Sequence, residues 1–448
     1  MVPHLHTSTS ARQHWGLLFA LLLATTPSAA SEAKRAPQDY GRPEERSADK
    51  ALLWGPRVVF FPLWLTTEYG LRRPLGAVVQ VAEREQWPKE IVDLFTFGDR
   101  RQITIFPSAL FDFGLLPSVG FNAQWRYFVT DPNTVRLHFG TWGPDWVAIR
   151  FVDSYALSKN ESIALDGRLV RRQDSYFFGF GPRSSADASS RYRSEHDEAS
   201  FAYEARMWRS SAFQARSGVR RVSLGDETCC DAPSVYDSVS RGLYPRPPGL
   251  GESWVAGFEH VSITLDSRKP RPEEGTGVRL TFHCEGVAAP GETTRRAWVK
   301  YGAEVGAFVD LTGTQRVISV GAAVELADPL SGTIPFPEQA TLGGARPMRG
   351  YVPNRLVDRS SFVAHLHYTW PIWVYLDGVI QVDVGNVFGA RLDGFDARPF
   401  RLSSSIGVRS NGNRDSGFEL LVGGATDPLD QGLHVSSLRF VVGSHHGF

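Results

Sequence analysis

The sequence predicts an all-β fold, namely a transmembrane antiparallel β-barrel of about sixteen strands preceded by short N-terminal amphipathic helices. Three observations lead to this prediction. The chain begins with an apparent export signal, and no later segment is apolar and long enough for a membrane-spanning helix. From about residue 100 onward, apolar residues alternate with polar ones at the period of a β-strand.

Residues 1–30 have the layout of a signal peptide. Arg12 lies in a weakly basic start, an apolar stretch runs from Gly16 to Ala24, and small residues end at Ala30, where we expect cleavage. The alternative is a single membrane anchor, but a spanning helix needs about 20 apolar residues. Residues 31–50 are polar and charged and are interpreted as a flexible linker.

Residues 51–99 are predicted to form a short periplasmic segment of two or three amphipathic helices. Apolar residues recur there at helical spacing, and four prolines punctuate the segment. An extra strand at residues 57–66 is the alternative.

The barrel is assigned to residues 100–448. In residues 120–127, for example, Phe121, Ala123 and Trp125 share one face, while Asn122 and Gln124 share the other. A soluble β-sandwich would show the same alternation. A barrel with a wet interior is favoured because the less apolar face also carries charged residues at strand centres. The apolar face would then meet lipid.

Segmentation of this region gives an even number of strands whose connections alternate in length. The long connections, 173–190, 225–252, 328–360 and 388–399, all follow odd-numbered strands. Long loops at one end and short turns at the other are typical of outer-membrane barrels. The expected strands are 102–111, 117–128, 134–142, 146–157, 161–172, 191–209, 211–224, 253–266, 275–286, 296–309, 315–327, 361–372, 376–387, 400–410, 416–424 and 433–448.

Composition argues against several other classes of protein. The formal net charge is zero and no basic stripe occurs, so nucleic-acid binding is not expected. There is no nucleophile elbow, P-loop or zinc-protease motif, so no enzyme, metal or cofactor is expected. His365 and His367 share a strand face and could bind a metal, but solvated lumen residues are the preferred interpretation.

The chain has three cysteines, which are too few for a disulfide scaffold. A bridge from Cys229 or Cys230 to Cys284 is one possibility. The adjacent cysteines can equally be incidental.

Four short motifs, in order, resemble the BamA/TamA superfamily of outer-membrane assembly and translocation barrels, the bacterial surface antigen type. Met348-Arg349-Gly350-Tyr351 resembles the family's signature in the sixth external loop, here 328–360. The other three resemble a family strand, a strand–turn element and a loop element. They are 382–388 with Asp383 and Gly385, 265–277 with Asp266, Arg268 and Gly275, and 176–182.

The resemblance implies that the sixth loop folds into the barrel and is locked there. Asp383 faces the lumen by alternation, and the resemblance implies that it pairs with Arg349. Gly350 would let the backbone turn sharply, and Tyr351 would pack against the wall. The alternative is an ordinary polar turn with solvated charges.

The sequence departs from the family pattern at several places. His367 stands where the family often has Glu, and Gln381 stands where it often has Phe; both are expected to line the lumen. The segment before the predicted barrel is too short for the polypeptide-transport-associated repeats that precede the family's barrel, so we expect them to be absent, which puts client capture by them in doubt. Phe448 ends the chain as a terminal barrel residue at the membrane interface.

The resemblance implies a protein of the bacterial outer membrane that assists insertion or translocation of proteins or lipids. Expected partners are outer-membrane lipids, with unfolded client proteins or periplasmic partner proteins in addition. A passive pore or structural barrel and a barrel-borne hydrolase are the two alternatives.

Overall fold

The computed structural model describes residues 84–445, apart from 231, 271–274, 292–294, 312, 314, 374–375 and 411–416, together with the single positions 69, 77 and 81. The predicted signal peptide, the linker and most of segment 51–99 lie outside the described residues, and so does Phe448.

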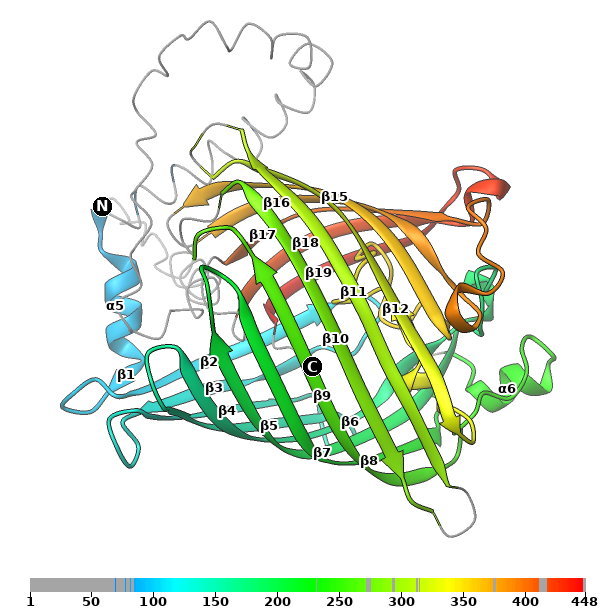
Figure 1. Ribbon diagram of the computed structural model, residues 1–448, viewed down its shortest axis with the longest axis horizontal. Helices are drawn as coiled ribbons and strands as arrows, with labels where there is room; N and C mark the ends of the chain where they lie inside the picture. Colours follow the sequence, from blue (N-terminus) through cyan, green and yellow to red (C-terminus); the bar gives the residue numbers. More distant parts are fainter. Residues whose placement is uncertain are drawn as a thin grey trace, which may run out of the picture.

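Seventeen strands form one antiparallel sheet, and all except the two-residue β1 form the wall of a closed sixteen-stranded barrel (Figure 1). The barrel predicted from sequence is therefore confirmed. Its strands are β2 Ile103–Asp112, β3 Ser118–Arg126, β4 Asn133–Thr141, β5 Val147–Ala156, β6 Glu161–Phe177, β7 Ser190–Arg206, β8 Ala212–Asp226, β9 Ser253–Asp266, β10 Gly277–Ala289, β11 Arg296–Asp310, β12 Val317–Ser331, β15 Ser360–Trp373, β16 Leu376–Phe388, β17 Arg401–Ser410, β18 Gly417–Thr426 and β19 Val435–His445.

The two ends of the barrel differ as the loop lengths predict. The short turns and the N-terminal helix α5 (Trp87–Leu94) lie at one end, here named the turn end. The long connections lie at the other end, named the loop end (Figure 1). They include loop 3 (178–189), loop 4 (227–252, with α6 Val235–Ser240) and loop 6 (332–359, with β13 Ala340–Leu342 and β14 Leu356–Asp358).

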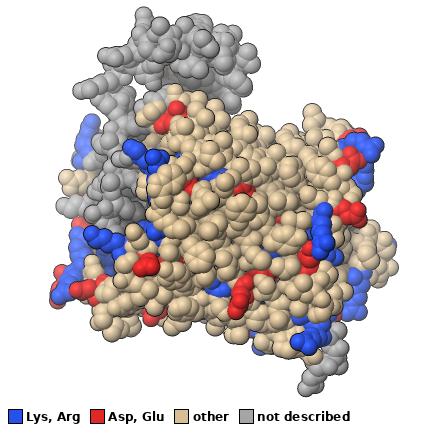
Figure 2. Space-filling model, in the orientation of Figure 1, with Lys and Arg blue, Asp and Glu red and all other residues tan. Residues whose placement is uncertain are grey.

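The outer wall is apolar, as expected for a surface in contact with lipid. Leu165, Val219, Val255 and Val320 are more than half exposed along it. Figure 2 shows that most charged residues on this face lie towards the two ends, with mainly uncharged surface between them. Among the described residues, no helix is long and apolar enough to cross a membrane.

The inner wall is polar over part of its length only. Ion pairs such as Arg150–Asp166 and Lys300–Glu325, each 2.8 Å, cross between neighbouring strands. Towards the loop end, however, inward-facing residues form an apolar core with loops 3, 4 and 6, which includes Phe177, Trp298 and Phe336. The expectation of a hydrophilic interior is wrong there, because loops folded onto the wall need a core of their own.

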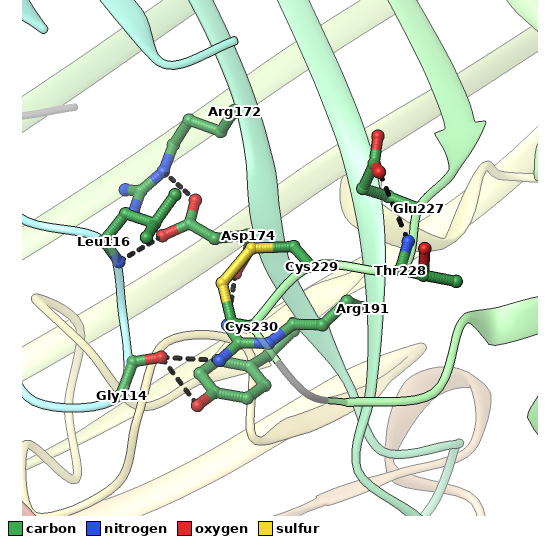
Figure 3. The surroundings of a disulfide bond; sticks show 10 residues. Gly114, Leu116, Arg172, Asp174, Arg191, Glu227, Thr228, Cys229 and Cys230 are labelled. Atoms are coloured by element: carbon green, nitrogen blue, oxygen red, sulfur yellow. Dashed lines mark hydrogen bonds and ion pairs between the residues drawn. A yellow bond between two sulfur atoms is a disulfide. The ribbon is translucent and has the colours of Figure 1, made fainter. Parts of the chain in front are cut away.

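Cys229 and Cys230, in loop 4, form a disulfide with each other, while Cys284 is free and exposed on β10 (Figure 3). The bridge to Cys284 considered from the sequence is therefore not formed. Near this disulfide, Arg191 donates to the carbonyl of Gly114, and Asp174 accepts from the N–H of Leu116. These contacts attach the connection after β2 to strands β6 and β7.

The barrel closes through an unusually short ladder. Among the described residues, which end at 445, three residue pairs join β19 to β2, whereas seven join β17 to β18 and fifteen join β7 to β8. The paired residues are Leu110, Phe111 and Asp112 with Gly443, Val442 and Val441, all in the half of β2 nearer the loop end. We refer to this junction as the seam.

Candidate functional site

Loop 6 packs against the inner wall of the barrel by its own apolar residues. β13 and β14 form a small separate hairpin within it. Between these strands the chain carries Met348 and Tyr351, which are fully buried. Both belong to an apolar cluster with wall residues from β15, β16 and β18, namely Val363, Val387 and Ala425. The predicted inward-folded loop is thus an element with its own core.

Arg349 makes an ion pair with Glu419 of β18, with two contacts of 2.5 Å between guanidinium nitrogens and carboxylate oxygens. The predicted pair between Arg349 and Asp383 is therefore wrong. The Arg349 side chain extends towards β18, while the backbone N–H of the preceding Met348 faces Asp383 on β16. Glu419 was missed from the sequence, although it alternates with Phe418 and Leu420 and is thereby placed on the inner face.

Asp383 holds the loop through its backbone instead of through Arg349. Its Oδ2 accepts from the backbone N–H of Met348 at 2.9 Å, and its Oδ1 lies 2.8 Å from Nε2 of His367. Met348 has a φ of 68°, a left-handed conformation that costs a non-glycine residue about 1 kcal/mol or more. The bond to the buried carboxylate helps to offset that cost. His367 thereby acts as a support for Asp383.

Gly350 allows close contact with the wall. A Cβ at this position would lie 2.3 Å from the carbonyl oxygen of Gly424 on β18, so no side chain fits. The N–H of Gly350 donates to Ser403 Oγ at 2.9 Å, and its carbonyl accepts from Ser437 Oγ at 3.0 Å. The chain does turn here, since the N–H of Tyr351 donates to the Met348 carbonyl at 3.1 Å, but the φ of Gly350 is not positive, so the close approach to β18 is the reason for glycine.

The remaining residues predicted for the site each make a different contact with the wall. The hydroxyl of Tyr351 donates to the carbonyl of Thr426 at the end of β18. A Cβ on Gly385 would lie 2.2 Å from the carbonyl oxygen of Phe362, so this glycine permits a close pairing of β15 and β16. Gln381 is buried and accepts from Ser405 Oγ at 3.2 Å. This hydrogen bond joins two strands of the wall and does not involve loop 6.

Two arginines that were not predicted attach loop 3 to loop 6 and to the wall. Arg355 of loop 6 donates to Ser184 Oγ at 3.0 Å and to the Ser184 carbonyl at 2.9 Å. Arg401 donates to the same carbonyl at 2.8 Å. Burial, together with the charge of Arg401, lowers the pKa of Arg355 to about 10. The motif at 176–182 therefore lies beside the signature loop.

The Asp266-Arg268 motif lies at the turn end of the barrel, whereas loop 6 starts from the loop end. Asp266 accepts from the backbone N–H of Arg268 at 2.9 Å and from its guanidinium at 2.6 Å and 3.0 Å. The Arg268 guanidinium carbon is 3.8 Å from the ring centroid of Phe308. Gly275, half-buried, lies later in the same turn. We interpret this motif as a structural clamp on the turn.

The described part of the chain contains no group of three or more His, Cys, Asp or Glu residues arranged to hold a metal. His365 and His367 stack with ring centroids 4.7 Å apart, and the carboxylate 2.8 Å from His367 is already used by loop 6. Within the described residues, the chemistry of the site is therefore that of a docking interaction between a loop and a wall.

Comparison with known proteins agrees with this geometry. The Omp85 superfamily domain matches residues 134–413. BamA from Haemophilus ducreyi lacking POTRA domains 1–3 has 12% sequence identity and a TM-score of 0.52, covering 77% of this chain and 70% of that one. CdiB from Acinetobacter baumannii has 10% identity and a TM-score of 0.47, and the match covers 77% of this chain and 59% of CdiB. No curated protein matches the sequence. Because the superfamily domain spans more than half of the residues, the chain belongs to the Omp85 superfamily.

Proposed function

We propose that this protein lies in the bacterial outer membrane and assists the insertion or translocation of proteins there through the seam between β2 and β19. The observation that carries the proposal is the three-pair ladder of the seam, in a wall whose other ladders have at least seven pairs within the described residues. Membership of the Omp85 superfamily and the likeness in fold to BamA support it.

Among the residues that the structure describes, the last pair of the seam is that of Gly443 with Leu110. A Cβ on Gly443 would lie 2.1 Å from the carbonyl oxygen of Ala109, and its φ of 147° is one that side chains rarely adopt. Nearer the turn end, β1 (Thr96–Phe97) pairs with Ile103 and Thr104 of β2 in place of β19. Within the described residues, positions 106–109 pair with neither strand and include Pro107, a residue that sheets tolerate at edges. An unpaired edge can receive another strand.

The apolar core at the loop end favours this proposal over a passive pore. It joins inward residues of β6 to β12 with loops 3, 4 and 6, including Phe258, Leu250 and Ile334. A water-filled channel would need a polar lining along its whole length. No observation favours a hydrolase.

The seam can be tested with a reversible tether. Phe111 and Val442 lie opposite each other across it, so cysteines at both positions, in a Cys284→Ala chain, can form a disulfide. The matched control places cysteines at Ile149 and Leu169, which lie opposite each other on β5 and β6. Each protein is reconstituted in liposomes and offered an unfolded outer-membrane barrel precursor, whose insertion is scored by protease resistance.

We expect oxidation of the seam pair to abolish insertion and reduction to restore it, while the control pair inserts the precursor in both states. Full insertion by the oxidised seam pair would contradict the proposal. Steady ion conductance without insertion by the untethered protein would favour a passive pore instead.

A further inference from the structure

One side chain bridges the three parts of the molecule that the proposed function uses. Arg439 lies on β19, the last strand, and is almost fully buried. Its Nε and one terminal nitrogen donate to both carboxylate oxygens of Asp112 on β2, at 2.8 Å and 2.7 Å. Its other terminal nitrogen donates to two carbonyls of loop 6, those of Gly344 at 2.6 Å and Arg349 at 3.1 Å.

The two halves of this guanidinium serve different elements. The bidentate contact with Asp112 crosses the seam next to its three backbone pairs, so it is a substantial part of what closes the barrel. The contacts with Gly344 and Arg349 hold the backbone of loop 6 on either side of Met348. Because a guanidinium is planar and rigid, fixing one edge orients the other.

We infer that Arg439 couples the docking of loop 6 to the closure of the seam. When loop 6 leaves the wall, the guanidinium loses two acceptors and becomes free to turn into the wet part of the lumen, which weakens its hold on Asp112. When the seam opens, the same guanidinium loses its carboxylate and binds the loop carbonyls less well. Such a coupling is reciprocal by thermodynamic necessity.

Among the described residues, one side-chain hydrogen bond from β19 to loop 6 bypasses Arg439: Ser437 Oγ donates to the Gly350 carbonyl at 3.0 Å. This bond does not reach across the seam to β2, so the coupling can be assigned to Arg439. Within the part of the chain that the structure describes, the Asp112 side chain bonds to Arg439 and makes no hydrogen bond or ion pair with loop 6. Asp383, which anchors Met348, lies on β16, and three strands separate it from β2 in the barrel. Changing either carboxylate therefore acts on one side of Arg439 and can be read out on the other.

Hydrogen exchange of the full chain in lipid nanodiscs provides the test. Asp112→Asn removes the charge across the seam, and we expect exchange in residues 343–351 of loop 6 to accelerate at least about fivefold. Asp383→Ala releases loop 6, and we expect a similar acceleration in residues 110–112 and 441–443. In an Arg439→Lys chain, whose ammonium cannot bridge both partners, each effect is expected to fall below about twofold.

Asp166→Asn is the matched control, because Asp166 pairs with Arg150 on strands far from the seam. It should change exchange in neither region. All variants are first shown to be folded by heat-modifiable gel mobility, and Asp112→Asn and Asp383→Ala decide the question alone if Arg439→Lys does not fold. Unchanged loop 6 exchange in Asp112→Asn, or equal acceleration in the Arg439→Lys chain, would overturn the inference.

The inference rests on the proposed function for its biological meaning, but exchange is measured without any client protein. Failure of precursor insertion and failure of coupling are therefore separate results.

Discussion

The docking of loop 6 depends on the side chain of Arg349. Its partner Glu419 is buried on β18, and removing one member of a buried pair leaves an uncompensated charge. Fully buried pairs cost about 3–5 kcal/mol when broken, and access of lumen water reduces this to about 1–3 kcal/mol here. We expect Arg349→Ala to accelerate proteolysis within loop 6, measured on the folded protein in detergent.

Arg346 supplies the control for this substitution, because it is exposed in the same loop. Arg346→Ala should leave the proteolysis rate unchanged. Since the partner is Glu419, a swap of charges in Arg349→Glu with Glu419→Arg should restore part of the protection, whereas Asp383→Arg should not. Rescue by Asp383→Arg would show that the loop docks in another register.

Gly350 permits a second prediction that does not involve charge. A methyl group at this position would collide with backbone atoms of Gly424, which cannot move without breaking the β17–β18 ladder. Gly350→Ala is therefore expected to undock the tip of loop 6 as fully as Arg349→Ala does. In Gly424→Ala, by contrast, the nearest atom to the new Cβ lies at 3.5 Å, an ordinary contact, so proteolysis should stay at the wild-type rate.

Asp358, in the β14 segment of loop 6, gives the docking a pH dependence. Burial raises its pKa from 3.8 to about 6. Because the folded pKa lies above the unfolded one, the contribution to stability is complete below about pH 4 and is lost as the pH rises through 6. Wild type and Asp358→Asn should thus unfold at similar temperatures at pH 4, while the variant should be the more stable at pH 7.5.

Asp393→Asn, an exposed carboxylate in the connection after β16, serves as the control for Asp358→Asn. The thermal midpoint of this control should follow wild type at both pH values. If the Asp358→Asn chain gains no stability at pH 7.5, the buried carboxyl of Asp358 is not the origin of the pH dependence.

At the scale of single residues, sequence reasoning located the site but not its contacts. Alternation places Asp383 on the inner face correctly, because each strand has a strict period of two. The choice of Glu419 as partner of Arg349 depends on the path of a long loop over the wall. No local pattern encodes that path, so the partner could only be seen in three dimensions.

At the scale of elements, the strands were predicted to within a few residues, since lipid on one side and polar side chains on the other impose an unbroken alternation. β6 is the exception. It continues to Phe177 instead of ending near 172, because Phe177 belongs to the apolar core with loops 4 and 6. The segment from Arg172 to Ser175 is polar and carries a shift in register, so the alternation is interrupted before the strand ends.

The short hairpin of β13 and β14 could not be predicted for a related reason. Each strand has only three residues, and their stability comes from the cluster around Met348 and Leu356. Elements of this length depend on tertiary packing more than on local propensity.

For the whole molecule, the position of the apolar core predicts how the barrel conducts ions. Loops 3, 4 and 6 meet over the inner wall at the loop end, where Trp298, Phe336 and Val357 are buried. The tip of loop 6 forms a second apolar cluster, with Met348 and Tyr351 against β15, β16 and β18, so undocking it uncovers this part of the inner wall. In planar bilayers we therefore expect low conductance from wild type and frequent open events from Gly350→Ala, with Gly424→Ala behaving as wild type. A wild-type protein that conducts steadily, with no change in Gly350→Ala, would mean that loop 6 does not close the lumen and that its docking serves the wall alone.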